Sequence, residues 1–188
     1  MESTREPDIE TPRLRLHHLS VDEMLALFDD PESASVFEGR TFANPHRVLI
    51  DDNRPLPWRV PQVRADPSSN RWFIRLIVER ATREVVGTTS FHAPPNDSGM
   101  VEIGLGLVPA GQGRGLGTEA VTGMWRWAVS QPAVLTLRYA VSPANVASVR
   151  LVQRLGAVRV GEQVDDEDGP EDIYEMSAEE FRRRHGGR

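Results

Sequence analysis

The 188-residue sequence predicts a mixed α/β domain. Two β-rich runs before residue 100 flank a short polar turn, as in an antiparallel hairpin. After residue 100, strand-like runs alternate with apolar residues at helical spacing, which is typical of a βαβα segment. The length suits one compact domain with a sizeable core, although two small lobes would also fit it. No internal repeats are present, so we expect a single α/β domain.

The N-terminal elements have weaker patterns than the rest. Leu14 and Leu16 alternate with arginines and indicate a strand within 9–19 that has one buried face. Ser20 then has the character of an N-cap and predicts a short helix. From 38 to 70 the periodicity fails, and Pro55, Pro57, Pro61 and Pro67 argue against a long regular element. A loop of this length inside a compact domain is usually functional or mobile.

The C-terminal elements are clearer. The hairpin strands are expected at 72–79 and 85–92. The next strand, at 100–108, contains Gly104 and Gly106, which indicates a bulge or the close approach of another backbone. The remaining expected elements are a helix at 114–130, a strand at 135–141, a helix at 145–155 closed by Gly156, a strand at 157–164, a short strand at 173–176 and a terminal helix that ends in Arg182, Arg183 and Arg184.

Two absences from the composition exclude several chemistries. All 22 Lys+Arg residues are arginines, and the chain has no cysteine. Without lysine there is no P-loop lysine and no Schiff base with pyridoxal phosphate. Without cysteine there is no thiolate nucleophile, disulfide framework or Cys-ligated zinc. The five histidines show no metal-ligand spacing on one face, so we expect no metal site.

The net charge of −6 comes from one short acidic segment. Its members are Asp165, Asp166, Glu167, Asp168, Glu171 and Asp172. They lack the ligand spacing of an EF-hand calcium loop. No basic stripe interleaved with aromatics is present, so no direct nucleic-acid partner is expected. No apolar run is long enough to span a membrane, and the N-terminus has no apolar signal-peptide region. We therefore expect a soluble, cytoplasmic protein.

The segment at 101–120 is the most informative part of the chain. It reads as a strand, a glycine-rich turn and an amphipathic helix. Backbone N–H groups at the start of a helix have no partner and carry partial positive charge. Glycines let a phosphate approach these groups closely. We therefore expect this turn to hold a phosphorylated ligand.

Three phosphate-binding motifs compete for this turn. A dinucleotide fingerprint needs an acidic residue about 20 residues on, and 120–161 contains none. A P-loop needs a lysine, which the chain lacks. The third interpretation takes Gln112-x-x-Gly115-x-Gly117 as a pyrophosphate loop for coenzyme A.

This loop and its context resemble the GNAT superfamily of acetyl-CoA-dependent N-acetyltransferases. The matching context is a strand that ends Leu107-Val108-Pro109 and a later helix that opens Asn145-x-x-Ser148 and ends Leu155-Gly156. Thr11-Pro12-Arg13-Leu14-Arg15-Leu16 and Gly117-Thr118-Glu119-Ala120 are similar to the ribosomal-protein N-acetyltransferase (RimJ/RimL-type) branch. A glycine turn that merely joins a strand to a helix would not explain all these matches.

The resemblance implies a fold and domain limits. The fold is a single GNAT-type domain in which helices flank a mixed, mostly antiparallel sheet and a splayed strand-turn-helix unit holds acetyl-CoA. The domain would cover 9–180, with tails at 1–8 and 181–188. Within it, 38–70 would be an irregular insertion beside the acceptor.

The resemblance also implies how the cofactor is held. The backbone of Leu107 and Val108 would pair with the pantetheine arm, as an added strand pairs with a sheet edge. Asn145 would bind or orient the pantetheine, and it is also a favoured N-cap. Arg114 would add positive charge to the pyrophosphate cradle. The full cradle would be Gln112, Gly113, Arg114, Gly115, Leu116, Gly117 and Thr118.

Acetyl transfer to an amine needs a base, an oxyanion site and a proton for the leaving thiolate. Glu102 is the candidate base, because burial in mid-strand would raise its pKa; an outward-facing strand glutamate is the alternative. Backbone N–H groups near Leu107 would hold the oxyanion. Many relatives place a tyrosine seven residues after the asparagine, but that position here is Val152. Ser148, Tyr139 or a water remain as the acid, or the thiolate leaves unassisted.

We expect direct transfer from acetyl-CoA to a primary amine, since no cysteine can carry an acetyl-enzyme. The first choice of acceptor is the N-terminal α-amine of a protein or peptide. Alternatives are a small amine, such as an aminoglycoside or polyamine, and a non-catalytic acetyl-CoA-binding module. The acidic segment is either a solvated loop or an attraction for a cationic amine beside the acceptor site. The sequence leaves open whether the protein is a monomer or a homodimer.

Overall fold

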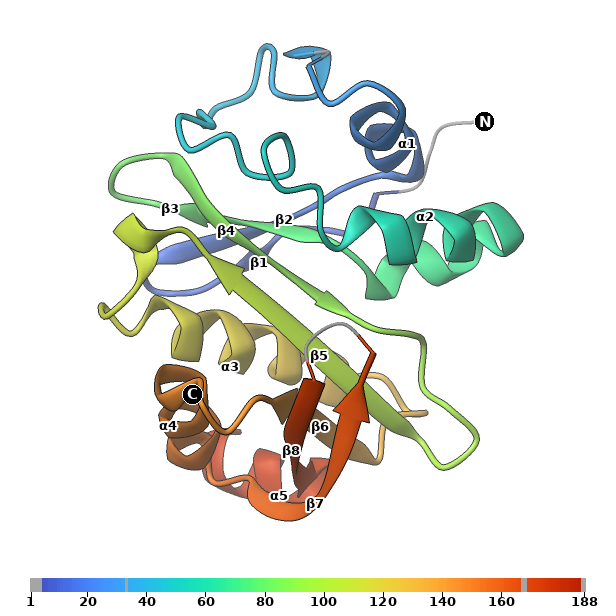
Figure 1. Cartoon of the computed structure of the whole chain (residues 1–188), viewed down its shortest axis with the longest axis vertical. Helices are drawn as coiled ribbons and strands as arrows, with labels where there is room; N and C mark the ends of the chain where they lie inside the picture. The colour runs from blue at the N-terminus through green and yellow to red at the C-terminus, as the bar shows by residue number, and fades with distance from the viewer. Residues whose placement is uncertain (1–4, 33, 167–168, 187–188) are drawn as a thin grey trace.

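Eight strands build one sheet in the part of the chain that the computed structural model describes, residues 5–32, 34–166 and 169–186 (Figure 1). In spatial order they are β1 (Ile9–Glu10), β2 (Leu14–His18), β3 (Arg75–Glu79), β4 (Glu84–Phe91), β5 (Met100–Leu107), β6 (Thr136–Val141), β8 (Gly169–Ser177) and β7 (Val158–Asp165). Neighbouring strands are antiparallel, except that β5 and β6 are parallel. The predicted mixed, mostly antiparallel sheet is therefore confirmed.

Helices cover both faces of this sheet. Within the described ranges the α-helices are α1 (Val21–Asp29), α2 (Leu56–Ala65), α3 (Leu116–Val129), α4 (Val146–Leu155) and α5 (Ala178–His185). Adjacent residues of a strand point to opposite faces of the sheet, so the contacts of two adjacent β4 residues show which helix covers which face. Phe91 stacks on Trp127 of α3 with a centroid distance of 6.2 Å, whereas the Ser90 hydroxyl accepts from Arg59 of α2 at 3.2 Å. Helices α4 and α5 pack with α3 on the first face, and α1 packs with α2.

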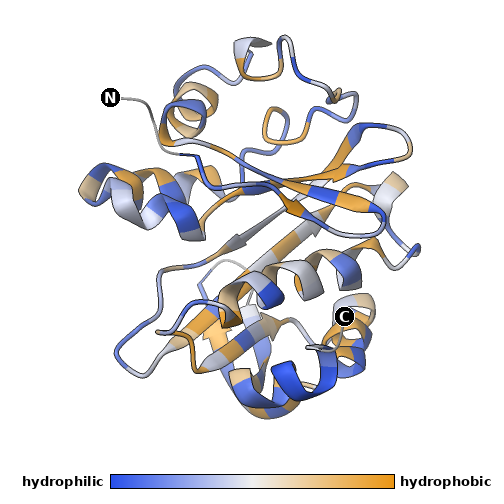
Figure 2. Cartoon of the chain, turned by 180° about the vertical axis from the view of Figure 1, so that it is seen from behind, coloured by the Kyte–Doolittle hydropathy of each residue, from blue (hydrophilic) through white to orange (hydrophobic). Residues whose placement is uncertain are grey.

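The core lies between the sheet and these helices. Its largest fully buried apolar side chains include Trp125, Phe73, Phe91 and Phe181. Burial of each such side chain stabilises the fold by about 1.5–3 kcal/mol. Figure 2 shows the hydrophobic residues gathered on the strands and the hydrophilic ones on loops and on outward turns of the helices. No helix among the described residues is long and apolar enough to cross a membrane.

Local signals predicted several element ends correctly. The Ser20 hydroxyl accepts from the Glu23 N–H, and the Glu23 carboxylate accepts from the Ser20 N–H, so a capping box begins α1. Asn145 caps α4, and Gly156 ends it with φ at 92°. The strand expected at 173–176 is longer, because β8 pairs with β7 from Gly169 to Glu175 and with β6 from Asp172 to Ser177.

The expectation that 38–70 has no long regular element is wrong for 56–70. Helix α2 spans ten residues there, and Pro67–Trp72 form a 3-10 helix that delays the start of β3 to Arg75. Pro55 is the N-cap of α2 and Pro57 lies in its first turn, where backbone N–H groups need no helical partner. Pro61 lies inside the helix, whose inner side is nonetheless held by burial of Leu56, Val60 and Val63.

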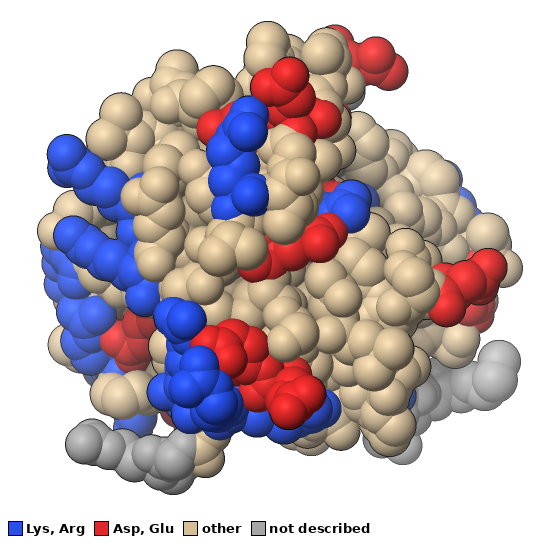
Figure 3. Space-filling view, turned by 90° about the horizontal axis from the view of Figure 1, so that it is seen from below, with Lys and Arg blue, Asp and Glu red and all other residues tan. Residues whose placement is uncertain are grey.

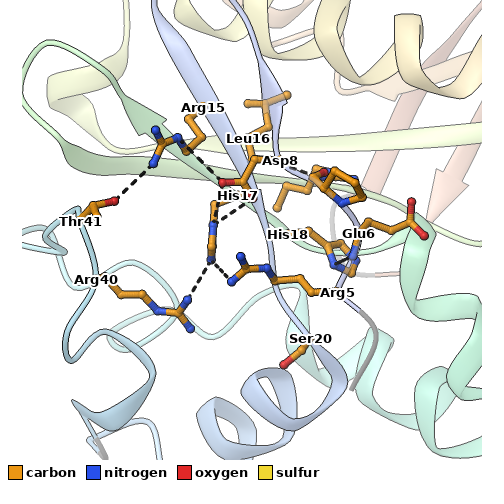
Figure 4. A network of polar contacts seen from close by, with 12 residues as sticks. Arg5, Glu6, Asp8, Arg15, Leu16, His17, His18, Ser20, Arg40 and Thr41 are labelled. Carbon is orange, nitrogen blue, oxygen red and sulfur yellow. Dashed lines mark hydrogen bonds and ion pairs between the residues drawn. The ribbon is translucent and has the colours of Figure 1, made fainter. Parts of the chain in front are cut away.

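Both expected tails are packed against the domain where they are described. Figure 4 shows the segment 5–8 beside β2, where the Glu6 N–H donates to His18 Nδ1 at 3.1 Å. Arg75 donates to the Pro7 carbonyl at 2.9 Å. At the other end, α5 crosses the expected boundary at residue 180, and Phe181 is buried edge-on to Trp125. The packed structure thus extends beyond 9–180 on both sides.

Candidate active site

The parallel strands β5 and β6 separate halfway along β5. Their pairing runs from Met100↔Thr136 to Glu102↔Arg138. Beyond Glu102, β5 stays paired with β4 as far as Leu107, while β6 continues beside β8. The half of β5 that follows Glu102 therefore presents its second edge to a gap in the sheet. Such an edge can pair with an extended ligand.

Backbone hydrogen bonds show which residues of β5 face this gap. The His92 N–H donates to the Glu102 carbonyl, and the Val108 N–H donates to the Val86 carbonyl at 2.9 Å, so even-numbered residues bond to β4. Because successive residues alternate, Leu107 faces the gap. Its carbonyl accepts from the Gln112 side-chain amide at 2.9 Å. Of the two residues expected to pair with pantetheine, Leu107 faces the gap, while the N–H of Val108 is used within the sheet.

A cavity of about 650 Å³ opens beside the gap, on the face that carries α3 and α4. The end of β5, the loop at 111–118 and the first turns of α4 line it. Most residues expected from the resemblance are among its lining residues, namely Leu107, Gln112, Gly113, Gly115, Leu116, Gly117, Thr118, Asn145 and Ser148. The structure thus brings the two separate motifs of the sequence to one cavity.

Glycines shape the loop for close approach. Gly113 and Gly115 have φ of 70° and 76°, a left-handed conformation that other residues adopt only with strain. Gly115 is also the N-cap of α3, so the unpaired N–H groups of the first helical turn lie at the cavity. A Cβ on Gly117 would come within 3.0 Å of Leu105 and 3.1 Å of Leu151. These features fit a pyrophosphate bound against the helix N-terminus.

Arg114 is the expected cradle residue whose side chain turns elsewhere. Its Nη1 donates to Glu79 Oε2 at 2.9 Å, and its Nη2 donates to the other oxygen of the same carboxylate. The carboxylate raises the pKa of this arginine further, through the hydrogen bonds first and then through its charge. Arg114 therefore ties the loop to β3, and its charge is partly neutralised there.

The cavity is also lined by two arginines that the sequence motifs did not single out. Arg150 and Arg154 lie four residues apart on α4, so they share one face of the helix. Both are exposed, and neither has a carboxylate within ion-pair distance in the described part of the chain. Seen from the end that carries α4 and α5, basic side chains gather along one side of the molecule (Figure 3). The i, i+4 spacing of Arg150 and Arg154, in the helix that Asn145 caps, was the sequence signal that could have identified these two arginines.

Ser148 lines the cavity and lies close to the buried Tyr139 of β6. Asn145 Oδ1 accepts from the Ser148 N–H at 3.1 Å, which fixes the start of α4. Burial raises the pKa of the Tyr139 phenol, and the nearby Ser148 side chain only partly offsets this. Val152 is fully buried in the core.

Glu102 lies on the opposite face of the sheet from the cavity. Val101 and Ile103 are buried on the α3 side, so the Glu102 carboxylate points toward the side of α2. Its side chain is 16% exposed, and His92 Nδ1 lies 3.4 Å from Oε1. Burial raises the pKa of Glu102, Arg138 and Arg59 lower it, and the charges of Glu171 and Asp165 raise it further. The balance is a raised pKa, as a general base working near neutral pH requires.

The acidic segment is divided between the two faces. Asp165 and Glu171 act on Glu102, and the Gln163 amide donates to Glu171 at 2.9 Å. Asp172 instead accepts from Arg159 at 2.7 Å. Asp166 is exposed, and Glu167 and Asp168 lie outside the described residues. Among the described residues of the acidic segment, Asp165 and Glu171 therefore lie close enough to Glu102 to raise its pKa.

Comparisons with known proteins agree with this geometry. The sequence profile of the acetyltransferase (GNAT) domain matches residues 13–158. The chain is 29% identical over 83 residues to the uncharacterised N-acetyltransferase YjdG of Bacillus subtilis (strain 168), a match that spans 44% of this chain and about half (49%) of that protein.

Two solved structures show the same fold. The ribosomal-protein-S5-alanine acetyltransferase of Vibrio fischeri is 15% identical, with a TM-score of 0.66 over 94% of this chain and 99% of that one. The aminoglycoside acetyltransferase AAC(6')-Ib, in complex with coenzyme A, is 19% identical, with a TM-score of 0.58 over 93% of this chain and 99% of that one. Their acceptors belong to different classes, so the shared fold does not specify the acceptor.

The matched profile covers more than three quarters of the chain and includes the separating strands, the glycine loop and the start of α4. The chain therefore belongs to the acetyltransferase (GNAT) domain family, whose members transfer acetyl from acetyl-CoA.

Proposed function

We propose that this acetyltransferase moves the acetyl group directly to a primary amine, with the N-terminal α-amine of a protein or peptide as first choice. The supporting observation is the position of Glu102 at the point where β5 and β6 separate. There the cavity lies on the face of the sheet that carries α3 and α4, and Glu102, with Glu171 and Asp165 near it, lies on the other. A cofactor on one face and an amine on the other would meet beside this carboxylate.

The residues of the cavity suit the parts of acetyl-CoA, which supplies an activated thioester. The N–H groups at the start of α3 and the loop of Gly113–Gly117 take the pyrophosphate. Arg150 and Arg154 add positive charge for the remaining phosphate. The edge of β5 at Leu107 aligns the pantetheine arm, and its N–H groups polarise the thioester carbonyl.

Glu102 then acts as the general base. It accepts a proton from the ammonium form of the acceptor, so that the neutral nitrogen forms the new C–N bond as the C–S bond breaks. Ser148, beside the protonated Tyr139, donates a proton to the departing thiolate, and the second proton that the nitrogen loses as the amide forms returns to Ser148 through solvent. The chain has no cysteine, so acetyl passes in one step without an acetyl-cysteine.

The α-amine is favoured because it is less basic than other aliphatic amines, with a pKa of about 7.7–8.0 against about 10.4 for a lysine side chain. A small polyamine or aminoglycoside is the second candidate, and the acidic residues near Glu102 favour it. Charge attraction draws either cation toward the base.

Thiol release from acetyl-CoA, measured with peptides, aminoglycosides and polyamines, tests the proposal. We expect turnover with peptides that have a free N-terminus and a loss of about 100-fold for Glu102→Gln near neutral pH. Cofactor binding without turnover on any amine would contradict transfer, and an unchanged rate for Glu102→Gln would exclude this residue as the base. The matched control is Glu162→Gln, an exposed strand glutamate on β7.

A further inference from the structure

Arg59 of α2 is a buried cation without a carboxylate partner in the described part of the chain. Its side chain is only 6% exposed. Nε donates to the Ser90 hydroxyl at 3.2 Å, and the guanidinium lies over the Phe73 ring at 5.7 Å. Burial lowers the pKa of Arg59 to about 10, so it remains charged at neutral pH. A buried charge without an ion-pair partner is costly to the fold, and groups with strongly shifted pKa values are enriched at functional sites.

Arg59 lies on the same face of the sheet as the candidate base. Its partner Ser90 is paired with Gly104, two residues beyond Glu102 on β5. The charge of Arg59 acts on both Glu102 and His92. A second cation beside Glu102, Arg138, has its own carboxylate, since Nη2 lies 2.6 Å from Glu175. Of these two arginines, Arg59 is the one that forms no ion pair with a carboxylate among the described residues, although the charge of Glu102 acts on it.

Gln62 adds a second unsatisfied group on the same helix. It lies three residues after Arg59, and its Nε2 donates to the His92 carbonyl at 3.1 Å. Its Oε1 is buried and accepts no hydrogen bond from the described residues. One side of α2 thus offers an unpaired cation and an unpaired acceptor next to His92 and Glu102. A ligand that carries both an anionic group and an N–H donor would satisfy both.

We infer that Arg59 forms an anion subsite of the acceptor site, and that the preferred acceptor is an amine that also bears a carboxylate. The ammonium end is attracted by Glu102 and its acidic neighbours, and the carboxylate forms charge-assisted hydrogen bonds with the guanidinium. The carboxylate belongs either to a free amino acid or to an acidic side chain next to a peptide N-terminus. The inference rests on the proposed function, because it assigns the acceptor of that reaction.

Matched acceptor pairs test the subsite. The first pair is alanine and alaninamide, and the second is a peptide beginning Ser-Asp and the same peptide beginning Ser-Asn. For the wild-type enzyme we expect a KM at least about tenfold lower for the carboxylate member of one pair. Which pair responds distinguishes a free amino acid from a peptide. Arg59→Gln is expected to abolish the difference while the KM for acetyl-CoA stays unchanged, and Arg59→Lys to restore part of it. Arg64→Gln, an exposed arginine of the same helix, is the control and retains the preference.

Equal KM values within both pairs, or an unaltered preference in Arg59→Gln, would overturn the subsite. Thermal stabilisation by N-acetylalanine, compared with N-acetylalaninamide, gives a readout that needs no turnover and no substitution. Stabilisation by the carboxylate compound alone supports the subsite even if Arg59→Gln does not fold, and a weaker stabilisation in Arg59→Lys strengthens that support. Stabilisation without any acetyl transfer would contradict the proposed function and leave the subsite standing. Acetyl transfer with equal KM values within both acceptor pairs and equal stabilisation by both compounds would contradict the subsite and leave the proposed function standing.

Discussion

Arg13 and Glu119 join the turn before β2 to the first turn of α3. Arg13 Nε donates to Glu119 Oε2 at 2.6 Å, and the Arg13 backbone N–H donates to Glu119 Oε1 at 2.7 Å. Arg13 Nη1 also donates to the Arg114 carbonyl at 2.9 Å, within the glycine loop. Although burial alone would raise the pKa of Glu119, the hydrogen bonds from Thr11 and Arg13 lower it. The loop that fits the pyrophosphate is therefore held in place from β2 as well as from β3, where Glu79 binds Arg114.

Replacing Arg13 should weaken cofactor binding without altering the chemical step. In Arg13→Gln the loop loses its bond to the Arg114 carbonyl, so a more flexible cradle must be ordered when acetyl-CoA binds. We expect the KM for acetyl-CoA to rise about three- to tenfold and kcat to change less than about twofold. Because Arg13 is half-exposed, the loss of folding stability should stay below about 1 kcal/mol. Arg15→Gln, two residues away and paired with Glu10, should leave the KM unchanged; equal effects of both substitutions would contradict the role of Arg13.

The two arginines of α4 should contribute to cofactor affinity through charge. Arg150→Gln and Arg154→Gln are each expected to raise the Kd of coenzyme A about two- to fivefold, with a smaller effect at high salt because exposed charges are screened. Calorimetric titration of coenzyme A and of its analogue without the ribose phosphate measures the effect. A loss that is greater for the intact cofactor would place the arginines at that phosphate. Arg126→Gln on α3, which donates to the His185 carbonyl, should bind both ligands as the wild type does.

The acidic neighbours of Glu102 should set the pH at which the enzyme becomes active. Glu102 must be ionised to act as a base, so the rate falls as the pH drops through its raised pKa. Glu171→Gln removes a negative charge that raises this pKa, and the acidic limb of kcat/KM should therefore move to lower pH. The measurement is kcat/KM from pH 5 to 9 for wild type, Glu171→Gln and the exposed control Glu162→Gln. A limb at the same pH in all three proteins would show that Glu171 does not act on the titrating group.

Sequence patterns predicted the parts of this site that depend on local structure. The Gln112 to Thr118 loop and the capped ends of α4 follow from residue types at fixed spacing, and the structure places them at one cavity. Contacts between distant segments were not predictable in this way. The ion pair of Arg114 with Glu79 joins residues 35 positions apart, and it turned a residue expected in the cradle outward. The place where β5 and β6 separate also depends on strand pairing, which no single segment specifies.

The prolines of α2 show why the acceptor side was harder to predict. Proline counts against a helix when its position within the helix is not considered. Pro55 and Pro57, however, lie at the start of α2, where the missing N–H group costs no helical hydrogen bond. With the helix unrecognised, Arg59 and Gln62 had no expected neighbours. Their relation to His92 and Glu102 arises only when α2 packs on the sheet.

His18 should make the fold less stable in mild acid. It is fully buried, and because Nδ1 accepts from the Glu6 N–H, Nε2 carries the proton and donates to the Asn70 carbonyl at 2.9 Å. Burial lowers its pKa from 6.5 to about 4. Between these values the unfolded chain binds a proton that the folded protein does not, so stability falls as the pH drops below 6.5. We expect His18 alone to cost about 2 kcal/mol between pH 7 and pH 5.

Urea unfolding of the wild type and His18→Gln at pH 7 and pH 5 measures this contribution. Glutamine has a donor and an acceptor but does not titrate in this range, so the substitution should remove most of the difference between the two pH values. His46→Gln, a more exposed histidine near Glu84, should retain it. If His18→Gln loses as much stability as the wild type between pH 7 and pH 5, then the acid sensitivity arises elsewhere, and the neutral His18 that joins residue 6 to Asn70 is not its cause.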